Sequence, residues 1–227
     1  MIIVKSALTN YARRHHLREV IRRQAVQINA TVGLLFNLGL PANGQLSLDL
    51  LNEITTFDDI LLANYTDTYL NLTLKTIVNL RFVHRHCLHT SHSFVFLDDD
   101  HGINLTQLHQ VFSTYSTAEV RRSSFGFVTS NAPVIRLAGH KCFVATSDFP
   151  FPRYPDYQMG LIPKLSIASA FTRLLPNEDT YVGMMLFKLG VKTHHLSNLI
   201  AHKTNFPPNT YPLVAGLDFF TKSLSIR

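Results

Sequence analysis

The first hundred residues alternate short apolar runs with longer stretches in which apolar side chains recur at helical spacing. This pattern predicts strands at residues 2–4, 32–38, 59–62 and 93–97, separated by helices at about 10–27, 46–54 and 68–87. Strands that alternate with helices usually form a mostly parallel sheet with helices on both faces. The sequence therefore predicts an α/β fold, in which a ligand binds beyond the carboxyl ends of the strands.

The second half of the sequence is less regular than the first. We expect strands at residues 125–129 and 142–146, and helices at 167–174 and 179–189. Residues 149–155 are rich in proline and are predicted to form a loop, because proline lacks a backbone donor and fixes φ. No repeat, low-complexity tract or linker divides the chain, so residues 1–227 are expected to form a single domain.

The composition limits the kinds of molecule that the chain is expected to bind. The chain has 227 residues, of which 46% are hydrophobic, so it can bury a core and is not expected to be disordered. Its formal net charge of +6 suits an anionic partner, such as a nucleic acid, an acidic surface or a phosphorylated small molecule. Beyond the first helix the basic residues are scattered, and no nucleic-acid-binding motif is present, so no nucleic acid partner is expected.

The sequence has neither an apolar run long enough to span a membrane nor a signal peptide at its start. Four Asn-x-Ser/Thr sites nevertheless hint at a secretory lumen, namely Asn29, Asn64, Asn71 and Asn104. A truncated N-terminus would reconcile these two observations.

Three adjacent carboxylates, Asp98, Asp99 and Asp100, follow the fourth predicted strand. Clustered carboxylates repel one another unless a cation offsets their charge, and Mg²⁺ and Mn²⁺ both prefer oxygen ligands. Residues i and i+2 of an extended segment point the same way, so Asp98 and Asp100 are expected to face one site. The alternative is a solvated acidic turn, but the preceding strand places the triplet at the ligand edge of the sheet.

Two other charged groups could carry chemistry. Either Glu178 or Asp179 could be a general base, although acidic residues are also common at a helix N-terminus. The basic residues 13–18 could meet a diphosphate through forked arginine donors, or they could form a solvated helix face. The histidines lack the spacing of a zinc site.

Six blocks of the sequence, in order, resemble the β-1,3-galactosyltransferase family, which also contains β-1,3-N-acetylglucosaminyltransferases. The most specific block spans residues 53–76, within which residues 67–75 read DTYLNLTLK and are similar to the family pattern DsY.NLTlK. The other blocks lie at residues 3–19, 36–39, 87–104, 154–160 and 178–183. The resemblance extends from residue 2 to about residue 190.

This resemblance implies a GT-A glycosyltransferase fold and a hexosyltransferase activity. It implies a UDP-galactose or UDP-N-acetylglucosamine donor, a Mn²⁺ (or Mg²⁺) cofactor and inversion at the anomeric carbon. The product would carry a β-1,3 linkage to a glycan acceptor on a glycoprotein or glycolipid. The resemblance also implies a Golgi membrane protein of type II, anchored by an N-terminal segment that is expected to be missing here.

The resemblance also assigns roles to individual residues. Asp100 would hold the metal with Asp98, and His202 would be a second type of metal ligand. Asp179, next to Glu178, would be the base that deprotonates the acceptor hydroxyl. Asp99 is expected to contact the ribose of the donor. The residues expected around its uridine and diphosphate are Ser6, Arg14 and Arg18.

The sequence departs from the family pattern at several positions near the expected donor and acceptor sites. His101 and Gly102 follow the acidic triplet where relatives usually carry an apolar and an aromatic residue, and Pro163 replaces a tyrosine. These departures support a second hypothesis, a catalytically impaired relative that binds nucleotide-sugar or glycan, or serves as a partner protein.

Overall fold

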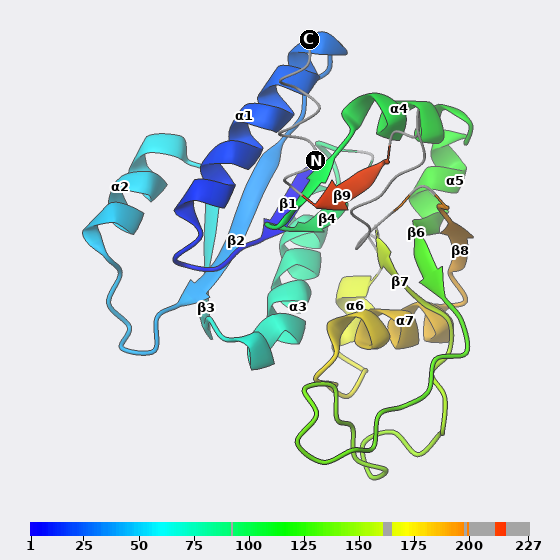
Figure 1. Cartoon of the computed structure of the whole chain (residues 1–227). Helices are drawn as coiled ribbons and strands as arrows, with labels where there is room; N and C mark the ends of the chain where they lie inside the picture. Colours follow the sequence, from blue (N-terminus) through cyan, green and yellow to red (C-terminus); the bar gives the residue numbers. More distant parts are fainter. Residues whose placement is uncertain (92, 161–164, 198, 200–211, 217–227) are drawn as a thin grey trace.

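A computed structural model describes residues 1–91, 93–160, 165–197, 199 and 212–216. Its central sheet has four parallel strands in the order β3-β2-β1-β4 (Figure 1). These strands are β1 (Ile2–Lys5), β2 (Leu34–Leu40), β3 (Ile60–Thr66) and β4 (Val95–Asp98). The four strands predicted in the first hundred residues and their parallel arrangement are therefore confirmed.

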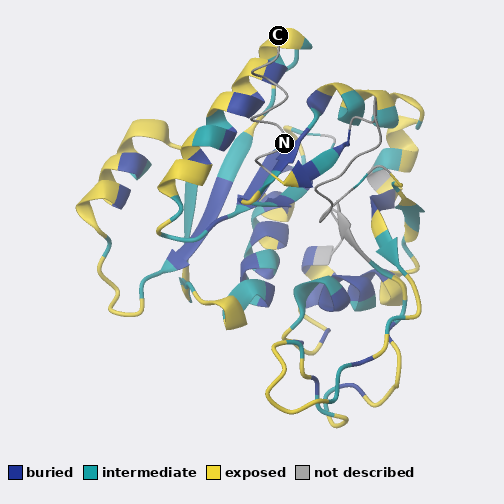
Figure 2. Cartoon of the chain, in the orientation of Figure 1, coloured by how far each residue is buried: buried dark blue, intermediate teal, exposed yellow. Residues whose placement is uncertain are grey.

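Helices cover both faces of this sheet, and the side chains of β1 show how. Ile2 and Val4 point into a core shared with α1 (Tyr11–Gln27) and α2 (Leu48–Phe57). Ile3 points the other way and packs against Val83 and Cys87. These two residues belong to a π-helical turn, Val83–Cys87, that extends α3 (Leu72–Phe82), which itself follows a short 3₁₀ turn at Tyr69–Asn71. The alternation of strand side chains thus divides the interior into two layers. Figure 2 shows the buried residues on the central strands and on the helices beside them.

The second half of the chain builds a smaller mixed sheet in the order β7-β6-β8. Its strands are β6 (Ser123–Thr129), β7 (Tyr157–Gly160) and β8 (Lys192–His195), with α6 (Leu165–Ser169) and α7 (Glu178–Leu189) packed beside them. Along the chain, β5 (His101–Ile103), α4 (Leu105–Ser113) and α5 (Thr117–Arg122) connect the two sheets, and β5 pairs antiparallel with β9 (Val214–Gly216).

Two predictions for the second half are wrong. Residues 142–146 are not a strand, because they lie in a long loop that is tied down by side chains instead of a neighbouring strand. Arg136 donates to the carbonyl oxygens of Val144, Phe149 and Phe151 at 2.6–2.9 Å. The helix expected at 167–174 is short and spans only Leu165–Ser169.

Two further observations concern the whole described chain. Its two cysteines, Cys87 and Cys142, are free thiols, although the sequence leaves open whether they pair. Among the described residues, none of the helices is both long enough and apolar enough to cross a bilayer.

Candidate active site

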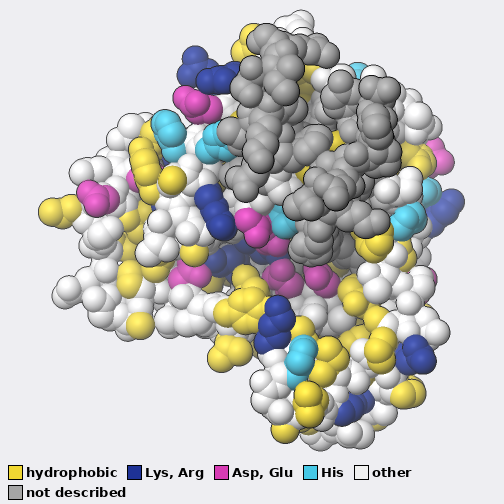
Figure 3. Space-filling view, in the orientation of Figure 1, with side chains coloured by type: hydrophobic (Ala, Val, Ile, Leu, Met, Phe, Trp, Pro, Cys, Tyr) yellow, Lys and Arg dark blue, Asp and Glu magenta, His cyan; other side chains and the backbone are white. Residues whose placement is uncertain are grey.

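The carboxyl edge of the central sheet meets the N-terminus of α7 at one cavity. Strands β1 and β4 are paired with Lys5 opposite Asp98, so both residues reach this edge. Glu178 and Asp179, the first residues of α7, line the same cavity. Figure 3 shows acidic side chains gathered in the middle of this face, next to lysine and arginine side chains. The two carboxylate groups singled out in the sequence therefore lie together in space.

Helix α7 is held in place at its first turn and at its middle. The Asn177 side chain caps the helix by accepting hydrogen bonds from the backbone N–H groups of Asp179 and Thr180. Gly183 faces β7 so closely that an added Cβ would lie 2.2 Å from the Cβ of Tyr157. The cap and this close approach together fix where the two acidic residues point.

Asp179 has the properties of a general base. Burial raises the pKa of its carboxyl to about 6, and the negative charges of Glu178 and Asp98 act in the same direction, while Lys5 opposes them. A carboxylate with this pKa is ionised at neutral pH and still accepts a proton more readily than an exposed one.

Lys5 is the main site residue to which sequence reasoning gave no role. Its Nζ lies 3.0 Å from Asp98 Oδ1 and is hydrogen bonded to Glu178 Oε1. Burial alone would lower its pKa, but the charges of Glu178, Asp98 and Asp179 raise it above the ordinary value, so Lys5 stays protonated. Its position in the family-like opening block was the available signal.

The long DTYLNLTLK block positions these groups from helix α3. Lys75 Nζ donates to the carbonyl oxygen of Ser6 at 2.6 Å and pairs with Asp67 at 2.9 Å, so it holds the loop after β1. The next residue, Thr76, donates through Oγ1 to Glu178 Oε2 at 3.0 Å. One helix therefore braces both the strand edge and the acidic start of α7.

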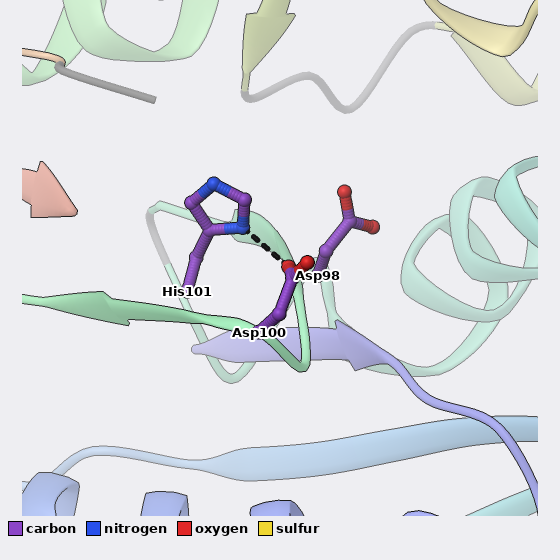
Figure 4. Close-up of side chains that lie close together, drawn as sticks. All are labelled: Asp98, Asp100 and His101. Carbon is purple, nitrogen blue, oxygen red and sulfur yellow. Dashed lines mark hydrogen bonds and ion pairs between the residues drawn. The ribbon is translucent and has the colours of Figure 1, made fainter. Parts of the chain in front are cut away.

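The acidic triplet begins at the last residue of β4, Asp98, and continues through a turn formed by Asp99 and Asp100. Asp98, Asp100 and His101 point to the same side of the turn, with their ligand atoms all within 4.8 Å of one another (Figure 4). The Asp100 Oδ1 atom lies 2.5 Å from His101 Nδ1, and this hydrogen bond is the main reason that the pKa of Asp100 is lowered. Two carboxylates and an imidazole form a donor set that fits a divalent metal ion.

Asp99 points away from this cluster and is buried. It accepts hydrogen bonds from Ser6 Oγ at 2.7 Å, Asn10 Nδ2 at 2.8 Å and Arg13 Nη1 at 3.0 Å. Both carboxylate oxygens and the Ser6 hydroxyl are thus occupied within the protein. Asp99 and Ser6 hold the loop after β1, and neither is among the described residues that line the cavity at the sheet edge.

Arg14 and Arg18, which the resemblance places around the uridine and the diphosphate of the donor, both have acidic partners within the fold. Arg14 is fully buried and forms a forked pair with Glu53 through bonds of 2.8 and 2.6 Å. Arg18 forms two bonds of 2.7 Å with Asp59 and an ion pair with Glu53. Both guanidinium groups neutralise acids inside the fold and neither faces the cavity. His202 and Pro163 lie outside the described residues.

The chain belongs to the galactosyltransferase family, whose model matches residues 12–197. It is 27% identical over 206 residues to human lactosylceramide 1,3-N-acetyl-beta-D-glucosaminyltransferase, covering 84% of this chain and 54% of that protein. It is 30% identical over 202 residues to mouse beta-1,3-galactosyltransferase 1, covering 84% of this chain and 60% of that protein. The chain therefore spans little more than half the length of these curated relatives.

Solved structures give a looser likeness. The galactosyltransferase LgtC, in complex with donor and acceptor sugar analogs, matches with a TM-score of 0.47 and 13% identity, over 98% of this chain and 94% of that one. A 4-diphosphocytidyl-2C-methyl-D-erythritol synthase matches with the same TM-score and 12% identity, over 100% and 98%. Likenesses at this TM-score carry no argument about activity.

Proposed function

We propose that this protein is an inverting hexosyltransferase that moves galactose or N-acetylglucosamine from a UDP-sugar to a glycan acceptor, with a β-1,3 linkage. The observation that carries the proposal is the pairing of Asp179, a buried carboxylate with a pKa of about 6, with the Asp98–Asp100 cluster across one cavity. Family membership and the names of the two curated relatives support the choice of sugars and linkage.

In this mechanism Asp179 accepts the proton of the attacking acceptor hydroxyl. Direct attack from the side opposite the leaving group inverts the anomeric carbon. Asp98 and Asp100 would hold a divalent cation, Mn²⁺ or Mg²⁺, which when bound supplies positive charge that stabilises the leaving diphosphate. Lys5 holds Glu178 and Asp98 at fixed positions and keeps Asp179 ionised at neutral pH.

The proposal includes a location. The activity belongs in the Golgi lumen, with the full-length protein held in the membrane by an N-terminal anchor. The four Asn-x-Ser/Thr sites support a lumenal environment. Immunofluorescence of the full-length protein beside a Golgi marker tests this part separately.

Two substitutions separate catalysis from donor binding. Asp179→Asn removes the base, so turnover is expected to fall about 100-fold or more while metal-dependent UDP binding is retained. Asp100→Ala removes a metal ligand and is expected to weaken both. Initial rates of UDP release and calorimetric UDP binding measure the two effects, with Asp148→Asn in the distant loop as the matched control.

Full turnover by Asp179→Asn would overturn the assignment of the base. Metal-dependent UDP binding by the unaltered chain, without turnover on any glycan acceptor, would favour the alternative of a binding or partner protein.

A further inference from the structure

His101 sits beside the two carboxylates in a fixed position. It is the first residue of β5, where it is paired with Gly216 of β9. Its side chain is 15% exposed, and it lines the same cavity as Lys5 and Asp179. The imidazole is therefore held by the backbone pairing of two strands, at the edge of the cavity where the metal is proposed to bind.

The geometry suits shared coordination of one ion. Bonds from an oxygen or nitrogen ligand to a small divalent ion are about 2.1 Å long, so ligand atoms on one ion lie about 3–4 Å apart. The ligand atoms of Asp98, Asp100 and His101 all lie within 4.8 Å of one another. This spacing is close to the one that a single shared ion requires.

We propose that His101 is a third protein ligand of the metal, and that its nitrogen makes the site favour transition-metal ions over Mg²⁺. The inference rests on the metal-dependent function proposed above. Carboxylates bind Mg²⁺ and Mn²⁺ alike, whereas an imidazole adds affinity in the order of the first transition series, with more for Co²⁺ than for Mn²⁺. Mg²⁺ gains least, because it prefers oxygen ligands in a regular octahedron.

A different role for His101 gives a different result. If the imidazole only donates a hydrogen bond to Asp100, it orients the carboxylate from outside the coordination sphere. Removing it would then lower the affinity for every metal by a similar factor. A nitrogen signal on the metal would also be absent.

The test titrates the purified chain with Mn²⁺, Co²⁺ and Mg²⁺ alone, by calorimetry and by paramagnetic resonance of bound Mn²⁺. Wild type is expected to show a nitrogen coupling on Mn²⁺ that is lost or reduced in His101→Ala. The same variant is expected to bind Co²⁺ about tenfold more weakly or worse, with a smaller loss for Mn²⁺ and the smallest for Mg²⁺. His84→Ala, at an exposed histidine, is the matched control.

Equal losses for the three metals, or a nitrogen coupling in His101→Ala that is unchanged from the wild type, would overturn the inference. If His101→Ala does not fold, as judged by circular dichroism, His101→Gln replaces it. If the chain binds no metal and still transfers the sugar, the inference about His101 is wrong, but the proposed transferase activity is retained. If bound Mn²⁺ shows the nitrogen coupling but the chain transfers sugar to no acceptor, the inference about His101 is retained and the proposed transferase activity is wrong.

Discussion

The two halves of the molecule position their charged side chains in different ways. In the first half, a regular parallel sheet brings Lys5 and Asp98 to one edge through strand pairing. In the second half, residues 130–156 form a loop without a strand, and its backbone pairing consists of one isolated bridge, between Pro133 and Arg153, and scattered hydrogen bonds such as that from Val144 N–H to the Ile135 carbonyl oxygen. Its order comes instead from buried aromatic side chains, such as Phe149 and Tyr154, packed in the core beside α7.

This difference explains where the proposed chemistry lies. The sheet edge provides the lysine and the carboxylates that are proposed to bind the metal, while the less regular half provides Asp179 at the start of a capped helix. The site is complete only where the two halves meet, and contacts from α3 join them. Each half can be disturbed separately, which makes the comparison testable.

The largest expected effect on stability comes from the sheet half. Arg14→Met leaves Glu53 buried without its forked partner, and breaking a buried pair from one side costs about 3–5 kcal/mol. The free energy of unfolding from urea denaturation measures this loss. Arg22→Met, on the exposed side of the same helix, is the control and is expected to change little. A near-normal stability of Arg14→Met would contradict the structural role assigned to Arg14.

A smaller loss is expected where the second half packs most closely. Gly183→Ala places a methyl group against Tyr157, and overpacking of this kind costs about 1–3 kcal/mol. The substitution also pushes α7 away from β7, so turnover should fall with stability. Gly216→Ala is the matched control for unfolding, because an added Cβ there meets no atom within 4 Å. Equal unfolding curves for the two variants would refute the close approach at Gly183.

The smallest effect is a shift in pH dependence that reports on the junction. Asp179 must be ionised to act, so kcat/KM of the wild type should fall about tenfold per pH unit below its pKa of about 6. Lys5→Met removes the charge that lowers this pKa, so the acidic limb should move to higher pH. Lys192→Met, on an exposed strand, should leave the profile unchanged. If the pH profile of Lys5→Met is unshifted, the charge of Lys5 does not affect the pKa of Asp179.

The same comparison shows what a sequence can reveal. The parallel sheet was predictable because each strand is a local apolar run. Asp98 and Asp100 lie together as predicted, but through a turn after β4 and not through an extended strand. Helix α5 was missed although its capping box, formed by Ser116 and Glu119, is visible in the sequence.

Other features depend on contacts between distant residues and leave no local pattern. The burial of Arg14 depends on Glu53, 39 positions away, so a basic helix face was expected where a buried ion pair occurs. The pairing of His101 with Gly216 and the anchoring of the loop by Arg136 likewise arise only after folding.

The most direct test of the central claim is the release of UDP by the purified chain from a panel of UDP-sugars with a glycan acceptor. The assay is run with Mn²⁺ and again with a chelator. We predict release from UDP-galactose or UDP-N-acetylglucosamine that requires the metal and stops in the chelator. A folded chain that neither releases nor binds UDP in Mn²⁺ would contradict the account.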